Sequence, residues 1–159
     1  MAANLNALLD QTGVAILEEL QRDARVSYSE LARRVGLSTP ATVERIRKLE
    51  DAGIIAGYGA RVNLDALGFG VTALIEVKTD PTRYERVREF ARNTLEVREC
   101  YFVTGESSFV TRVVVRNINE LQALIERMGL FGSTRTSVAL SSPIVKDSFD
   151  VASSREAAR

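Results

Sequence analysis

Residues 33–48 gather positively charged side chains. Five cations occur there against the single anion Glu44, although the whole chain has a formal net charge of zero. The cations are Arg33, Arg34, Arg45, Arg47 and Lys48. Such groups neutralise phosphates, and arginine can also make a bidentate contact to guanine. We therefore predict a nucleic-acid surface, and the competing interpretation is a solvated helix face.

Three helices are expected to position this surface. The first follows Asp10, a suitable N-cap, and the second follows Ser27, which forms a capping box with Glu30 and ends at Gly36. The third opens at Thr39-Pro40. Because proline suits the first helical position and the preceding residue avoids the α region, Thr39 is the expected cap. Its apolar stripe is predicted to be Val43, Ile46 and Leu49.

Two short helices joined by a glycine turn indicate a helix-turn-helix. The second helix of that motif enters the major groove and meets base edges near its N-terminus. The outward residues near that end are Ser38, Thr39, Ala41, Glu44 and Arg45. We expect Arg45 to contact a base and Arg47 and Lys48 to contact phosphates, whereas Thr42 lies at the seam between the faces. The sequence pI of about 6.4 suggests weak binding by a monomer.

The second half of the chain alternates in polarity as β-strands do. Strand-like runs and amphipathic helical runs follow one another in the order β-α-β-β-α-β, which is the ferredoxin-like arrangement. We therefore predict an α+β protein, with a winged helix-turn-helix domain followed by a ferredoxin-like domain. The expected boundaries are 5–64 for the first domain, 65–70 for a linker, 71–150 for the second domain and 151–159 for a flexible tail.

A four-stranded sheet with both helices on one side leaves its other face bare. The runs "TALIEV" and "TRVVVR" predict that this face is hydrophobic and needs a partner. Pairing of two sheets would give a two-fold dimer and present two recognition helices to successive turns of double-stranded DNA.

The residue inventory disfavours catalysis. The chain contains no histidine, which removes the commonest general base and metal ligand, so no catalytic or metal site is expected. The single cysteine, Cys100, is interpreted as a small buried hydrophobe. One cysteine, no signal-like start and no long apolar run together predict a cytoplasmic protein that does not enter the membrane.

The segment Leu37–Tyr58 resembles the signature of the Lrp/AsnC (feast/famine) transcriptional regulators, with "RIRKLE" and "GIIAGY" as its core. The stretches "RECYFVTGESSFV" and "TRTSV" resemble the same family's ligand-binding and oligomerisation domain. The resemblance covers roughly residues 5 to 150. It implies a homodimer that can assemble into octamers and a regulator that responds to amino acids, without a cofactor.

The resemblance also implies where a small-molecule effector would bind. The family loop commonly reads Gly-Asp-(Tyr/Phe)-Asp, and the corresponding residues here are Gly105, Glu106, Ser107 and Ser108. Because Ser108 replaces an acidic residue, binding is expected to be weaker, directed to another ligand, or absent. Thr134 and Thr136 match positions that line the pocket from a neighbouring dimer, although both suit an ordinary strand.

Two alternatives to a sequence-specific regulator remain open at this stage. One is an architectural protein that coats DNA with little sequence preference. The other is an enzyme built on the ferredoxin-like fold, which the helix-turn-helix and the missing histidine both disfavour.

Overall fold

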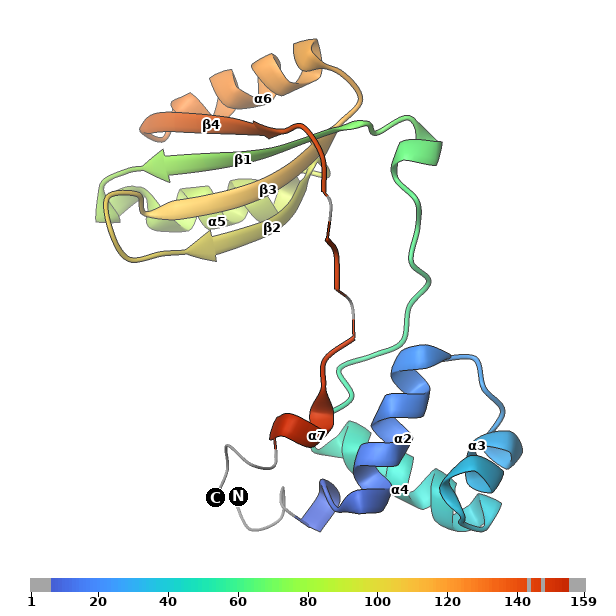
Figure 1. The fold of residues 1–159 in the computed structure, drawn as a ribbon. Coiled ribbons are helices and arrows are strands. Elements are labelled where there is room, and N and C mark those ends of the chain that lie inside the picture. The colour runs from blue at the N-terminus through green and yellow to red at the C-terminus, as the bar shows by residue number, and fades with distance from the viewer. Residues whose placement is uncertain (1–6, 143, 147, 155–159) are drawn as a thin grey trace. The chain divides into compact units, whose positions relative to one another are not determined.

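The computed structural model describes residues 7–142, 144–146 and 148–154. The chain divides into two compact units (Figure 1): one contains the residues up to Arg61 together with those from Val145 onward, and the other spans Val62–Ile144. No helix in the described ranges has the length and apolar character that crossing a bilayer would require.

The first unit is helical. Its elements are α2 (Gln11–Arg22), α3 (Tyr28–Val35), α4 (Thr39–Asp51) and the short α7 (Val151–Ser154). One face of each of the three longer helices contributes to a single buried cluster, which contains Ile16, Leu17, Leu31, Ile46 and Leu49. The helix-turn-helix predicted from the glycine turn is therefore present, as α3 followed directly by α4.

Local signals determine where these helices begin and end. The Asp10 carboxylate accepts from the Gly13 N–H at 2.8 Å, and the Ser27 hydroxyl accepts from the Glu30 N–H at 3.2 Å. Gly36 adopts a φ of 71°, the left-handed conformation that closes α3. Ser38, not Thr39, caps α4, so that prediction was wrong. Pro40 sits one residue deeper than expected because no N–H in the first turn needs an intrahelical partner.

The buried face of α4 also differs from the expected one. Thr42, Ile46 and Leu49 are buried, whereas Val43 is 39% exposed. Positions 42, 46 and 49 follow the helical spacing i, i+4, i+7 and stay on one stripe, while 43, 46 and 49 drift around the helix. The Thr42 hydroxyl donates to the Ser38 carbonyl at 3.1 Å. Thr42 therefore belongs to the core and does not lie on the outer surface of α4.

The second unit contains the strands β1 (Val71–Lys78), β2 (Val97–Phe102), β3 (Phe109–Val115) and β4 (Ser133–Ala139). Its helices are α5 (Tyr84–Asn93) and α6 (Ile118–Gly129), with 3-10 turns at Asp65–Leu67 and Pro81–Arg83. The sheet has the order β2-β3-β1-β4, and all neighbours are antiparallel. This topology confirms the ferredoxin-like prediction.

The helix-covered face of the sheet holds the core, and the other face is mixed. Ala73, Ile75 and Val77 on β1 pack with residues of α5 and α6 such as Val87 and Leu124. The opposite face carries Leu74 and Val114 but also two ion pairs, Glu76–Arg135 and Glu99–Arg112. The expectation of a hydrophobic open face was wrong, because most valines of these runs point toward the helices.

Two connecting segments differ from the predicted boundaries. Residues 56–63 contain no helix or strand, so the arm after α4 forms no paired β-wing. The chain beyond Val145 belongs with the first unit, and Val151–Ser154 is helical where a flexible tail was expected. The Phe149 backbone exchanges hydrogen bonds of 2.6 and 3.1 Å with the Gln21 side chain of α2, which holds this segment in place. Residues 155–159 of the predicted tail lie outside the described residues.

Candidate functional site

The exposed face of α4 is the candidate nucleic-acid surface. The exposed residues along it are Thr39, Pro40, Val43, Glu44, Arg47 and Lys48. Lys48 and Glu44 form an i,i+4 ion pair at 2.7 Å, which lowers the pKa of the Glu44 carboxyl. Arg47 forms no ion pair or hydrogen bond within the part of the chain that the structure describes. Arg47 is therefore the cation on this face whose charge is least compensated.

The N-terminal end of α4 presents small polar groups. Ser38 and Thr39 are exposed, and Ala41 is half-buried. The Ser38 hydroxyl accepts from the Ala41 N–H at 3.4 Å, a long contact that leaves the oxygen able to take another donor. These residues lie at the N-terminal end of α4, the end at which the recognition helix of a helix-turn-helix meets base edges, so their role as base contacts stays a prediction.

Arg45 is engaged inside the unit. Its guanidinium makes a bidentate pair with Asp10, with both hydrogen bonds at 2.6 Å. The hydrogen bond from Arg45 lowers the pKa of the Asp10 carboxyl, which also caps α2. The pair joins the middle of the recognition helix to the start of α2 across 35 residues of sequence. Sequence reasoning treated Asp10 only as a cap and Arg45 only as a base contact, and it missed this tie.

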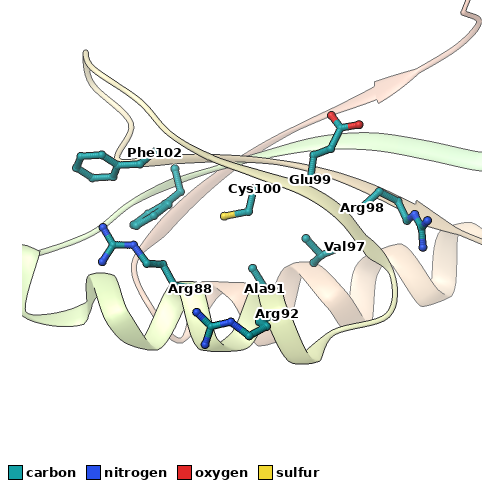
Figure 2. A pocket seen from close by; sticks show the side chains of 9 residues that line it. Arg88, Ala91, Arg92, Val97, Arg98, Glu99, Cys100 and Phe102 are labelled. Carbon is teal, nitrogen blue, oxygen red and sulfur yellow. The ribbon is translucent and has the colours of Figure 1, made fainter. Parts of the chain in front are cut away.

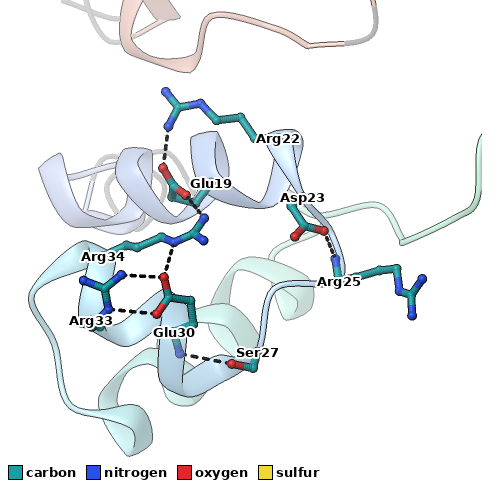
Figure 3. Close-up of polar contacts among 8 residues, drawn as sticks. All are labelled: Glu19, Arg22, Asp23, Arg25, Ser27, Glu30, Arg33 and Arg34. Carbon is teal, nitrogen blue, oxygen red and sulfur yellow. Dashed lines mark hydrogen bonds and ion pairs between the residues drawn. The ribbon is translucent and has the colours of Figure 1, made fainter.

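The two arginines at the end of α3 are also paired (Figure 3). Arg33 donates to both Glu30 oxygens at 2.9 and 2.7 Å, and Arg34 donates to Glu30 and to Glu19 of α2, both at 2.8 Å. Hydrogen bonds from Arg33 and then Arg34 lower the pKa of Glu30 to about 2. Because the Glu30 carboxylate binds these arginines, the capping box of α3 is only half formed. Fewer of the five cations in residues 33–48 therefore carry an uncompensated charge than a count along the sequence suggests.

A small hollow in the second unit contains part of the predicted effector loop. It measures about 160 Å³ and is lined by Glu76, Lys78, Glu106, Ser107, Ser133, Thr134 and Arg135. The Ser107 hydroxyl donates to Glu76 at 2.7 Å, and Arg135 donates to the same carboxylate at 2.7 and 2.8 Å. These contacts, Ser107 first and Arg135 second, lower the pKa of Glu76. The hollow therefore offers fixed charges of both signs.

Other predicted effector residues have structural roles. Ser108 is buried, and its hydroxyl donates to the Thr79 carbonyl at 3.1 Å and accepts from the Thr79 N–H at 3.3 Å. Gly105 has a φ of 110°, a backbone conformation that residues with a side chain rarely adopt. Thr136 pairs with Ile75 and is not among the residues that line the hollow. Sequence analysis did not predict that Glu76, Lys78 and Arg135 line this hollow, because only the pairing of β1 with β4 brings them beside the loop.

These features define a helix-turn-helix protein with an α+β ligand-binding domain, and the comparisons give its family. Residues 9–50 match the AsnC-type helix-turn-helix domain, and residues 72–149 match the Lrp/AsnC ligand binding domain. The chain belongs to the Lrp/AsnC family of transcriptional regulators, as the resemblance had indicated.

Relatives and solved structures agree along most of the chain. It is 39% identical over 134 residues to the uncharacterized HTH-type transcriptional regulator YezC of Bacillus subtilis, covering 84% of this chain and 95% of YezC. B. subtilis LrpC superposes with a TM-score of 0.81 at 30% identity, covering 86% and 98% of the two chains. A feast or famine regulatory protein of M. tuberculosis complexed with L-methionine has a TM-score of 0.81 at 33% identity, covering 89% and 98%.

Proposed function

We propose that this regulator reads an operator with the exposed face of α4. Ser38, Thr39 and Ala41 would meet base edges, and Arg47 and Lys48 would contact phosphates. The observation that carries the proposal is the uncompensated Arg47 on the outer face of α4. Arg45 takes a positioning role, because its guanidinium is already bound to Asp10.

The proposal includes a homodimer that can assemble further into an octamer and that acts in the cytoplasm. The formal net charge of zero supports the dimer, since two subunits double the phosphate contacts and thereby raise affinity. Two-fold symmetry predicts a roughly palindromic operator with half-sites about 10 base pairs apart or a multiple of that spacing.

Footprinting on genomic fragments tests the DNA-binding proposal. Discrete half-sites on a small set of fragments are expected. Continuous protection of any fragment would instead indicate an architectural protein that coats DNA, and no protection even in dilute buffer would contradict the proposal altogether.

The proposed effector is an amino acid bound at the hollow beside Ser107. An ammonium group would donate to Glu106 or Glu76, and a carboxylate would accept from Arg135 or Lys78. The hollow is small, about 160 Å³, which suits a site completed by a second subunit. The M. tuberculosis relative complexed with L-methionine supports an amino acid as the ligand class.

Thermal-shift screening of the amino acids tests this assignment. A true effector raises the melting temperature in proportion to the logarithm of its concentration. Glu106→Gln is expected to reduce that shift, whereas Glu126→Gln on the outer surface of α6 serves as the matched control. Equal shifts in both variants would place the effector elsewhere.

A further inference from the structure

A second hollow lies in the other part of the ferredoxin-like unit, between α5 and β2 (Figure 2). Its volume is about 340 Å³, and it is lined by Arg88, Ala91, Arg92, Val97, Arg98, Glu99, Cys100, Phe102 and Phe109. Cys100 pairs with Thr111, which is buried on the helix side of the sheet. This hollow is therefore on the opposite sheet face from the one beside Ser107. Cys100 was expected to be buried, but it is exposed at this edge strand.

The charge of this hollow is positive and only partly compensated. Three arginines contribute to its lining, Arg88 and Arg92 from α5 and Arg98 from β2, and the Arg98 side chain points away from the other two in Figure 2. Arg92 and Arg98 form no ion pair or hydrogen bond with any described residue. Glu99, the one acidic residue of the lining, is bound to Arg112 on the open face of the sheet and points away from the hollow in Figure 2.

Arg88 and Arg92 stand one helical turn apart on α5. Like charges at i and i+4 destabilise a helix, and Arg98 adds a third cation from the facing strand. Arg88 has only a 3.2 Å pair with Glu85, whose side chain is 71% exposed. A bound anion would relieve this repulsion, because charge-assisted bidentate hydrogen bonds to arginine are strong and geometrically specific.

The floor of the hollow is apolar. Phe109 is buried, Phe102 is exposed at the rim, and Ala91 and Val97 complete the surface around the thiol. The Arg88 guanidinium lies 5.7 Å from the centre of the Phe102 ring and 5.9 Å from that of Phe109. This stacking keeps one cation at the edge of the apolar floor.

We propose that this hollow binds a small organic anion, a carboxylate attached to an apolar or aromatic body. The carboxylate contacts Arg92, and the apolar body lies on Phe102 and Phe109 beside Cys100. A phosphate of the DNA backbone satisfies the cations but leaves the concave apolar floor unused, and small-molecule sites combine such a floor with a few polar groups. The site is separate from the amino-acid hollow, because neither its residues nor its sheet face are shared with it.

Cys100 provides a reporter for this site because it is the only cysteine in the chain. The probe is phenylacetate, and the rate of Cys100 alkylation by N-ethylmaleimide is followed by mass spectrometry on the full-length protein. We expect phenylacetate to slow alkylation until the site is saturated, with half of the effect at about millimolar concentration, because so small a ligand binds weakly. Phenylacetamide has the same shape without the charge and is expected to give no protection.

Two variants on α5 separate the site from general charge effects. Arg92→Gln removes a cation of the hollow and is expected to weaken phenylacetate binding roughly tenfold or more. Arg86→Gln removes a cation from the same helix outside the hollow and is expected to leave protection unchanged. Circular dichroism melting verifies that both variants are folded.

Four results would overturn the proposal. Equal protection by phenylacetamide would show that charge does not matter, and unchanged protection in Arg92→Gln would place the anion elsewhere. Protection by inorganic phosphate or duplex DNA, with none by phenylacetate, would assign the cations to the nucleic-acid backbone. Slower alkylation at higher protein concentration without any probe would show that a second copy of the chain covers the hollow.

Discussion

Removing the Arg45–Asp10 pair tests whether the recognition helix is positioned by a tie to α2. The appropriate changes are Arg45→Gln and Asp10→Asn, alone and together. Asparagine is as good an N-cap as aspartate, so Asp10→Asn keeps the cap of α2 while it removes the ion pair. The double-mutant cycle then isolates the interaction between the two side chains.

The geometry gives the expected magnitude of the coupling. Two charge-assisted hydrogen bonds at 2.6 Å would stabilise a dry site by several kcal/mol, but the side chains are 32% and 41% exposed. Solvent screening reduces exposed pairs to about 0.2–1 kcal/mol, and the bidentate geometry places this pair at the upper end of that range. We expect a coupling free energy of about 1 kcal/mol and, for each single variant, a fall in melting temperature of about 4–8 °C for a unit of this size.

Urea denaturation of the full-length chain, followed by circular dichroism at a helix-sensitive wavelength, gives the four unfolding free energies. A coupling below about 0.3 kcal/mol would lie within ordinary additivity error and would refute the proposed tie. Binding to operator DNA supplies a second readout. A positioning role predicts that both single variants lose affinity alike on every operator variant. If only Arg45→Gln loses affinity, and the loss depends on the base at one operator position, Arg45 contacts that base directly.

Three further predictions concern individual side chains. The stability that Glu30 contributes should be lost as the pH falls from the ordinary pKa of 4.5 toward the folded-state pKa of about 2, because the folded state holds this carboxyl deprotonated. Glu30→Gln should flatten this part of a plot of unfolding free energy against pH. Lys48→Ala should weaken binding similarly on all DNA sequences and reduce the slope of log affinity against log salt by about 1, measured by fluorescence anisotropy; an unaltered slope would show that Lys48 does not contact a phosphate. Ser108→Ala should cost about 1 kcal/mol or more in unfolding free energy, because it leaves the Thr79 N–H without its partner, whereas Ser107→Ala should cost less because that side chain is only half-buried.

The effector loop shows how far sequence reasoning reached toward the site. The predicted loop lies between β2 and β3, and three of the residues proposed for the effector site, Glu106, Ser107 and Thr134, line one hollow. The opposing charges of Glu76 and Arg135 were not anticipated, because they lie 59 residues apart and meet only through the pairing of β1 with β4.

What the sequence determined by itself was local. The caps at Asp10 and Ser27, the left-handed Gly36 and the β-α-β-β-α-β order depend on contacts within a few residues or on periodicity, and these can be read directly along the chain.

Only the tertiary structure decided which side chains were left available for binding. It buried Thr42, committed Arg45 to Asp10, left Arg47 unpaired among the described residues and exposed Cys100 between arginines. The physical reason is that an ion pair or a burial event depends on which faces meet in space. Neighbours such as Arg45 and Arg47 can therefore have opposite roles although their residue types are the same.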